Sequence, residues 1–325
     1  EMRSLNKIAH STAFCSGWYN NIAPLAAKQL LASNFFQTSV LCLAARKGMG
    51  IKMIELKSGK IRVEILEPDS ERQGIRFDRM GFISCVYFEN EPITSEYFED
   101  NNFVGSGLCN EFGITSPVGY KEGEWFIKIG AGLLKADSEP YSFMKNYECV
   151  PGKCFYKKTS QNSAEFVTEV KTEDYGILYK KTVSLERDNI KIAYILENTG
   201  IKAIETDEYA HNFLKLRPGY KAITAPVSDD STQRIAAENN ILSIPCEKSE
   251  NFICRYKPKN PNEFSWCILD GKLKIHESAH FSVKNFSVWK TNEIISPEVT
   301  CDIRIEPRET KEWERVYTFR NIQGG

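Results

Sequence analysis

One histidine stands in a stretch where polar and aromatic residues alternate, at residues 205–216 (ETDEYAHNFLKL). If this stretch is a β-strand, successive side chains point to opposite faces, so His211 shares a face with Asp207, Tyr209 and Phe213. That face is polar, titratable and aromatic together, whereas a face that only filled a core would be apolar. Aromatic platforms beside hydrogen-bonding groups, with one group that moves a proton near neutral pH, are typical of a sugar site. A structural histidine held by hydrogen bonds is the alternative for His211.

A second group of candidates lies in the segment 104–147, which is rich in glycine and aromatic residues. Its seven glycines predict long turns with close backbone approach. Loops that lie over a sheet commonly carry ligand contacts, so we expect part of a pocket wall here. The candidates are Asn110, Glu111, Trp125 and Lys128. For each of them, a structural loop that packs under its own aromatic residues is the alternative.

The cysteines and the remaining histidines do not predict a metal site. Ten cysteines are scattered along the chain without a CxxC pair, so we interpret them as reduced thiols in a reducing, cytoplasmic compartment. His276 and His280 are four residues apart, which brings two ligands together only on a helix, and a strand is expected directly after them. A surface role is therefore favoured for both, and we expect neither a metal nor a cofactor.

The elements that position these residues are predicted to be strands. From residue 51 onward apolar and polar residues alternate, as in 61–65, 82–88 and 190–196, and turn-forming residues separate the runs at 58–60, 187–189, 198–200 and 270–271. Strands without long intervening helices favour an antiparallel all-β sandwich over a βαβ fold. We expect one large β domain over residues 50–325.

The N-terminal residues 1–49 differ from the rest in charge and pattern. They hold five basic residues and one acidic residue, which gives +4, so the remaining chain carries -5 of the total charge of -1. Residues 23–45 suit a short amphipathic helix, and the composition is typical of a transit peptide, although an expression or gene-model artefact fits as well. We expect this extension to be dispensable for the β domain.

Composition excludes two classes of partner. A net charge of -1 offers no electrostatic attraction for nucleic acid. No apolar run reaches the roughly 18 residues that a membrane-spanning helix needs. With 42% hydrophobic and 26% charged residues, the chain has an ordinary soluble composition.

Three stretches together resemble the galactose mutarotase family, also called the aldose 1-epimerases. They are YILENTG at 194–200, EYAHNFLKL at 208–216, and SPEV at 296–299 followed by a strand that ends in VYTF at 316–319. The resemblance covers roughly residues 50–320 and implies a supersandwich of many antiparallel strands whose curved sheet face binds an aldose. It also implies that His211 is the general acid at the ring oxygen and that Glu298 is the carboxylate base.

One feature of the family is missing from this chain. Many members carry an earlier His-Gly pair and an arginine that help to bind the sugar, whereas this sequence has no histidine between His10 and His211. Lys128, which precedes Ile129 and Gly130, is the candidate for the comparable loop. The departure puts the substrate in doubt more than the fold.

Paired acid and base groups suffice for interconverting the α and β anomers of a hexose or hexose derivative without a metal or cofactor. We expect Trp125, Tyr209 and Phe213 to offer stacking faces to the sugar, and Asp207 to hold His211 protonated. Glu293 and Glu306 rival Glu298 as the base.

Three functions stay open from the sequence. The first is an aldose mutarotase, which is an isomerase of carbohydrate metabolism acting on a monosaccharide. The second is a non-catalytic carbohydrate-binding protein of the same fold, an alternative that the missing histidine supports. The third, a sugar lyase or hydrolase on a similar sandwich, is disfavoured because no second long catalytic domain accompanies it.

Overall fold

The computed structural model describes residues 52–68, 74–99, 102–113, 117–245, 251–269 and 272–322, and these residues contain strands but no helix. The expected extension 1–49 lies outside them. Every strand pair is antiparallel, so the predicted antiparallel all-β class is confirmed. Within the described ranges there is no helix long and apolar enough to cross a membrane.

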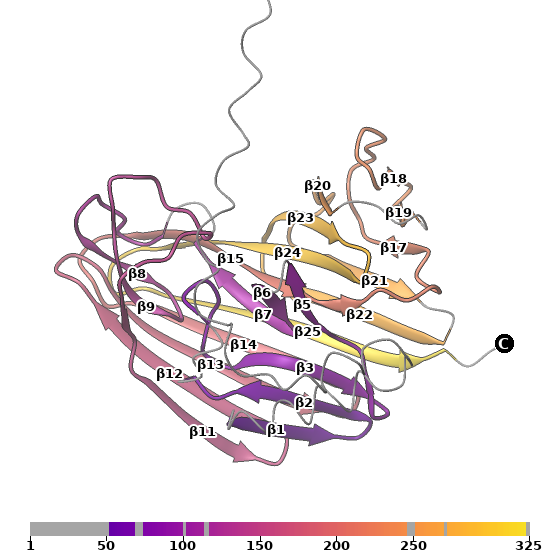
Figure 1. Ribbon diagram of the computed structural model, residues 1–325, viewed down its shortest axis with the longest axis horizontal. Helices are drawn as coiled ribbons and strands as arrows, with labels where there is room; N and C mark the ends of the chain where they lie inside the picture. The colour runs from indigo at the N-terminus through magenta and orange to yellow at the C-terminus, as the bar shows by residue number, and fades with distance from the viewer. Residues whose placement is uncertain are drawn as a thin grey trace, which may run out of the picture. The chain divides into compact units, whose positions relative to one another are not determined.

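The first large sheet has ten strands and carries the histidine stretch. Its main path is β1-β2-β3-β7-β15-β24-β23-β20 (Figure 1). Outside this path, β4 pairs with β3 and β16 pairs with β24. The bounds are β1 (Met53–Ser58), β2 (Ile61–Leu66), β3 (Phe82–Phe88), β4 (Glu91–Pro92), β7 (Leu108–Phe112), β15 (Ile204–Asn212), β16 (Leu214–Lys215), β20 (Phe252–Tyr256), β23 (Val283–Lys290) and β24 (Ile294–Ile305).

The second large sheet also has ten strands, in the order β11-β12-β13-β14-β25-β22-β21-β17-β19-β18. Its bounds are β11 (Cys154–Ser160), β12 (Ser163–Lys171), β13 (Gly176–Glu186), β14 (Asn189–Asn198), β17 (Ala222–Thr224), β18 (Ala237–Glu238), β19 (Ile241–Ser243), β21 (Phe264–Leu269), β22 (Leu273–His280) and β25 (Thr310–Asn321). Two small sheets complete the described structure: β5 (Glu96–Glu99) with β6 (Asn102–Ser106), and β8 (Trp125–Lys128), β9 (Gly132–Lys135) and β10 (Cys149–Pro151).

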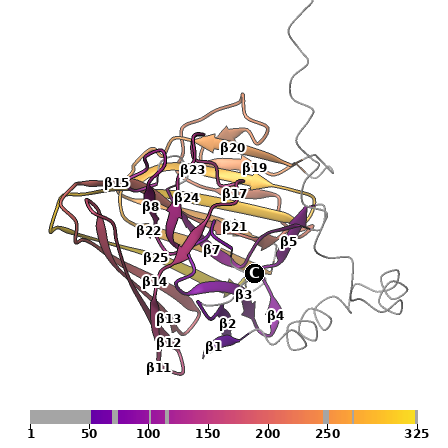
Figure 2. The same ribbon diagram turned by 60° about the vertical axis from the view of Figure 1, so that its left-hand side comes forward.

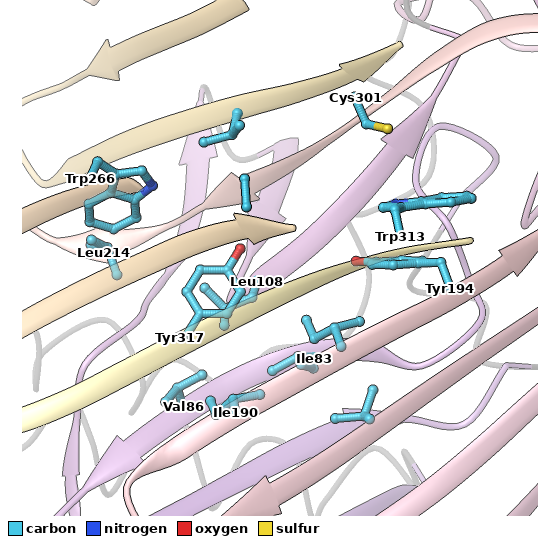
Figure 3. Close-up of a cluster of buried hydrophobic side chains, with 14 of the residues drawn as sticks. Ile83, Val86, Leu108, Ile190, Tyr194, Leu214, Trp266, Cys301, Trp313 and Tyr317 are labelled. Carbon is cyan, nitrogen blue, oxygen red and sulfur yellow. The ribbon is translucent and has the colours of Figure 1, made fainter. Parts of the chain in front are cut away.

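The two large sheets lie face to face, with β1 to β3 of the first opposite β11 to β13 of the second (Figures 1 and 2). The apolar core fills the space between them because the alternating pattern of each strand gives one apolar face. Figure 3 shows Val86 and Leu108 of the first sheet in one cluster with Ile190, Tyr194 and Tyr317 of the second.

A network of buried charges also occupies this inner layer. Arg315 is fully buried and donates to Glu208 at 2.7 Å and to Glu277 at 2.8 Å. Lys181 lies 3.1 Å from Asp78 and donates to Asn110 at 2.6 Å. Because Glu208 of β15 and Asn110 of β7 point inward, the residues that alternate with them point to the opposite face of the first sheet.

The two late histidines lie within β22 rather than before a strand. His276 and His280 are four residues apart, which on a strand separates them by roughly 13 Å. One metal ion therefore cannot bind both side chains at ordinary ligand distances.

Candidate active site

The histidine strand β15 lies in the first sheet between β7 and β24. Tyr209 is paired with Glu111 of β7 on one side and with Thr300 of β24 on the other. Because residues directly opposite each other share a face, Glu111 and Tyr209 point to the same side as His211. Glu298 of β24 reaches that side as well. Three adjacent strands thus bring one histidine and two carboxylates together.

His211 is bonded at both ring nitrogens. Its Nε2 lies 3.1 Å from Oε2 of Glu111, and its Nδ1 lies 3.1 Å from Oε1 of Glu298. An ionised carboxylate only accepts hydrogen bonds, so both nitrogens carry a proton when both bonds are made. Burial lowers the pKa of His211, but the two glutamates outweigh burial and raise it above its usual value of 6.5. The site therefore favours the imidazolium form.

Glu111 is a fully buried carboxylate that several donors share. Its Oε2 accepts from Arg76 Nε at 2.9 Å and from the Tyr209 hydroxyl at 3.1 Å, in addition to His211. Burial alone would raise the pKa of Glu111, but His211, Lys128 and Arg76 together hold it at about 2. Glu111 is therefore ionised at any pH at which the site would work.

Lys128 is the second buried cation of the site. Its Nζ lies 3.9 Å from Oε1 of Glu111 and donates to the backbone carbonyl of Phe112. Burial lowers the pKa of Lys128 to about 8, although Glu111 works against this effect. The amine thus stabilises the Glu111 carboxylate near neutral pH.

Glu298 is nearly buried but has one unused oxygen. Its Oε1 accepts from Ser296 Oγ at 2.9 Å as well as from His211. Its Oε2 makes no hydrogen bond within the described part of the chain. This oxygen is therefore the one that can take up a proton without first losing a partner.

Aromatic rings surround the charged groups on this face. The ring centroid of Phe77 lies 5.4 Å from that of His211, and the Tyr209 ring lies 4.2 Å away. The guanidinium carbon of Arg76 is 4.8 Å from the Phe77 centroid and 4.2 Å from that of Phe143. Phe143 is 40% exposed, and Arg76 and Tyr209 are half-buried, so the site meets solvent on this side.

Several residues expected from the sequence do meet here. The structure brings Glu111, Lys128 and Tyr209 into one group with His211 and Glu298. Neither rival carboxylate is part of this group. Glu306 pairs with Arg304 at the surface, and Glu293 lies in the turn before β24, where its backbone amide bonds to Thr291.

Two expectations are wrong. Asn110 does not line the site, because its side chain bonds to Tyr194 and Glu208 in the layer between the sheets. Asp207 does not hold His211 protonated, because the two glutamates occupy both ring nitrogens, and Asp207 accepts from Lys284 at 3.3 Å.

The two other expected aromatic residues lie elsewhere. Phe213 is on the His211 side but only 1% exposed, and it packs in an apolar cluster against Trp289. Its ring lies beside that of His211 and offers no exposed face to a ligand. Trp125 lies on β8 beside Lys135 and has no ring or hydrogen-bond contact with the His211 group in the described ranges. The half-exposed rings at the site are instead Tyr209 and Phe143.

Sequence reasoning missed four residues of this site: Arg76, Phe77, Phe143 and Ser296. Arg76 lies in an irregular segment before β3, and Phe143 lies in the connection between β9 and β10, so neither has a strand period to mark it. Ser296 did have a signal, because it is two residues before Glu298 and therefore on the same face of β24.

Comparison with known proteins gives matches among solved structures alone. No family model matches the sequence, and no curated protein does. An aldose 1-epimerase candidate from Escherichia coli superposes with a TM-score of 0.57 at 12% identity, covering 84% of this chain and 100% of that one.

Two further structures agree with this match. A galactose mutarotase-related enzyme from Lactobacillus acidophilus gives a TM-score of 0.53 at 11% identity, covering 83% of this chain and 97% of that one. A galactose mutarotase-like protein from Clostridium acetobutylicum gives 0.53 at 13% identity, with 84% and 96% covered. The chain therefore adopts the galactose mutarotase-like fold.

Proposed function

We propose that the chain is an aldose 1-epimerase that interconverts the α and β anomers of a hexose or hexose derivative. The observation that carries the proposal is the direct contact between a protonated histidine and a carboxylate with one free oxygen, His211 Nδ1 to Glu298 Oε1 at 3.1 Å. Anomerisation requires a positioned acid and a positioned base.

The reaction runs in four steps. Oε2 of Glu298 removes the proton of the anomeric hydroxyl, and the electrons of that O–H bond form the C1 carbonyl. The bond from C1 to the ring oxygen breaks, and the ring oxygen takes the proton from Nε2 of His211. Rotation about the C1–C2 bond exposes the other carbonyl face. The same steps in reverse close the ring as the other anomer.

The contacts of the site couple the two proton transfers. Ionised Glu298 favours the charged form of His211, so the pKa of His211 falls once Glu298 has taken the substrate proton. The imidazolium becomes a stronger acid at the moment when the ring oxygen needs its proton. Glu111 can release Nε2 because Arg76 and Tyr209 still donate to the same carboxylate oxygen.

The surrounding groups are suited to holding a sugar. Arg76, which is half-buried, offers donors to hydroxyl groups, and the rings of Tyr209 and Phe143 offer faces to the C–H side of a pyranose. A non-catalytic carbohydrate-binding protein is the second candidate, because the resting His211 has both nitrogens occupied.

Polarimetry of a panel of free and phosphorylated aldoses tests the proposal. We expect wild-type protein to accelerate mutarotation, and His211→Asn or Glu298→Gln to lower the rate by roughly 10² to 10⁴ while sugar binding suffers less. Glu306→Gln is the matched control, because Glu306 is a surface carboxylate eight positions after Glu298, and this variant should keep the wild-type rate.

The pH profile adds a second measurement. The rate should fall on the acid side as Glu298 takes up a proton and on the alkaline side as His211 loses one, with the alkaline limb above pH 6.5 because the pKa of His211 is raised. An unchanged rate in either variant would remove that residue from the mechanism. Sugar binding without acceleration in the wild type would establish the binding protein instead.

A further inference from the structure

Ser296 links the backbone of the histidine strand to the carboxylate of Glu298. The side chain is fully buried on β24. Its Oγ accepts from the backbone N–H of Asn212 at 2.9 Å and lies 2.9 Å from Oε1 of Glu298. Because Asn212 follows His211 directly, one hydroxyl connects both halves of the acid–base pair.

This hydroxyl stands where the strand pairing is interrupted. Paired residues of β15 and β24 run from Ile204 with Ile305 to Tyr209 with Thr300, and pairing resumes only at Leu214 with Ile295, through β16. Pro297 lies in the gap and has no N–H to donate. Side chains bridge the gap instead: Ser296 receives the N–H of Asn212, and the Asn212 amide donates to the carbonyl of Pro297.

The direction of each hydrogen bond is fixed by proton count. The Asn212 N–H can only donate, so the single proton of the Ser296 hydroxyl is left for Oε1 of Glu298. Oε1 then receives two donors, Ser296 and His211, and the carboxylate cannot rotate without breaking both.

We propose that Ser296 is a positioning residue that makes Oε2 of Glu298 the proton-accepting atom. The inference rests on the proposed function and adds to it which carboxylate oxygen accepts the proton and which residue determines this. Without Ser296 the carboxylate keeps one of its two donors and turns about its side-chain bond, so its free oxygen no longer has one position. Loss of a donor also makes the protonated carboxyl easier to form.

Few other groups can change charge beside Glu298. Among the described residues, the titratable side chains on this face are His211 and Tyr209 of β15 and Cys109 and Glu111 of β7. The cations Arg76 and Lys128 lie beside Glu111 and stay charged on the acid side, and the pKa of Glu111 is about 2, so Glu111 stays ionised over most of that range. Burial raises the pKa of Cys109 to about 12 and that of Tyr209 well above its usual 10. A shift of the acid limb of the rate profile therefore reports on Glu298 itself.

The test compares the pH–rate profiles of Ser296→Ala, Ser296→Thr and Ser287→Ala. Ser287 is the matched control, because it lies opposite Glu298 on β23 but makes no hydrogen bond to it within the described residues. We expect Ser296→Ala to lower kcat by roughly 10- to 100-fold with little change in KM, since a hydrogen bond to a charged group is lost. The acid limb should move to higher pH in this variant.

Ser296→Thr keeps a hydroxyl and should return the acid limb towards its wild-type position, and Ser287→Ala should leave it unmoved. The proposal is overturned if Ser296→Ala keeps the wild-type acid limb, or if the threonine variant behaves as the alanine variant does. If wild-type protein does not accelerate mutarotation, the proposed function fails separately. Carbon-13 NMR titration of the Glu298 carboxyl in wild type and Ser296→Ala then tests the positioning contact on its own.

Discussion

Replacing Glu111 with glutamine removes the carboxylate that Arg76, Lys128 and His211 share, at nearly constant side-chain size. The pKa of Glu111 is about 2 in the folded protein, below its ordinary value of 4.5. Because the folded pKa is the lower one, ionised Glu111 stabilises the fold fully above pH 4.5, and this stability is lost as the pH falls towards 2. The difference between the two pKa values corresponds to about 3 kcal/mol at neutral pH.

Urea unfolding at pH 7 and at pH 3 measures this contribution. We expect Glu111→Gln to be less stable than wild type by about 3 kcal/mol at pH 7, and the gap to shrink to about 1.5 kcal/mol at pH 3. Glu205→Gln on the neighbouring strand β15 is the control, because Glu205 is exposed and should change the stability by no more than about 0.5 kcal/mol. A gap that stays constant with pH would refute the reasoning.

The same substitution has an effect on the rate profile. His211 loses one of the two carboxylates that raise its pKa, so the alkaline limb should move to lower pH in Glu111→Gln. If the limb stays in place while stability falls, Glu111 stabilises the fold without setting the protonation of His211.

Two further substitutions test the sheet packing. Arg315→Met leaves two buried glutamates without their counterion and should lower the free energy of unfolding by about 3–5 kcal/mol in urea, whereas a loss below about 1 kcal/mol would contradict the buried network. Gly107→Ala places a Cβ 1.9 Å from the carbonyl oxygen of Ile83 at a φ of +64° and should strongly lower the melting temperature. Gly74→Ala, with a similar φ of +60° and nothing within 4 Å, should lower it much less, and equal losses would argue against the steric clash.

The fold was largely predictable because apolar and polar residues alternate along most of the chain after residue 50. The expected run 82–88 is strand β3, the run 61–65 lies inside β2, and the run 190–196 lies inside β14. The shared face of Tyr209 and His211 was predictable for the same reason, since it needs only the alternation of one strand.

The contacts of His211 were not predictable from the alternation of residues, because they depend on which strands are neighbours, and Glu298 was named as its partner only through the family resemblance. Glu111 is 100 positions and Glu298 is 87 positions from His211, and no local pattern fixes that β7 and β24 flank β15. The face to which Asn110 points was ambiguous as well, because every residue of β7 is buried. The adjacent polar residues Asn110 and Glu111 therefore do not indicate which of them faces the site. Arg76, in an irregular segment, had no period at all.

The strand β15 has polar residues on both faces, and the two faces of the sheet differ in whether all their polar groups have fixed hydrogen-bond partners. On the inner face Glu208 lies against Arg315 at 2.7 Å, where both side chains are fully buried and neither meets solvent. On the outer face of the sheet, Glu298 of the neighbouring strand β24 keeps one oxygen without a hydrogen bond among the described residues, and Arg76 is half-buried. Buried polar groups with fixed partners hold a strand in place, whereas proton transfer needs an atom that can gain and lose a partner. The inner face can therefore hold the strands of this sheet rigidly, while the outer face keeps one carboxylate oxygen without a fixed partner.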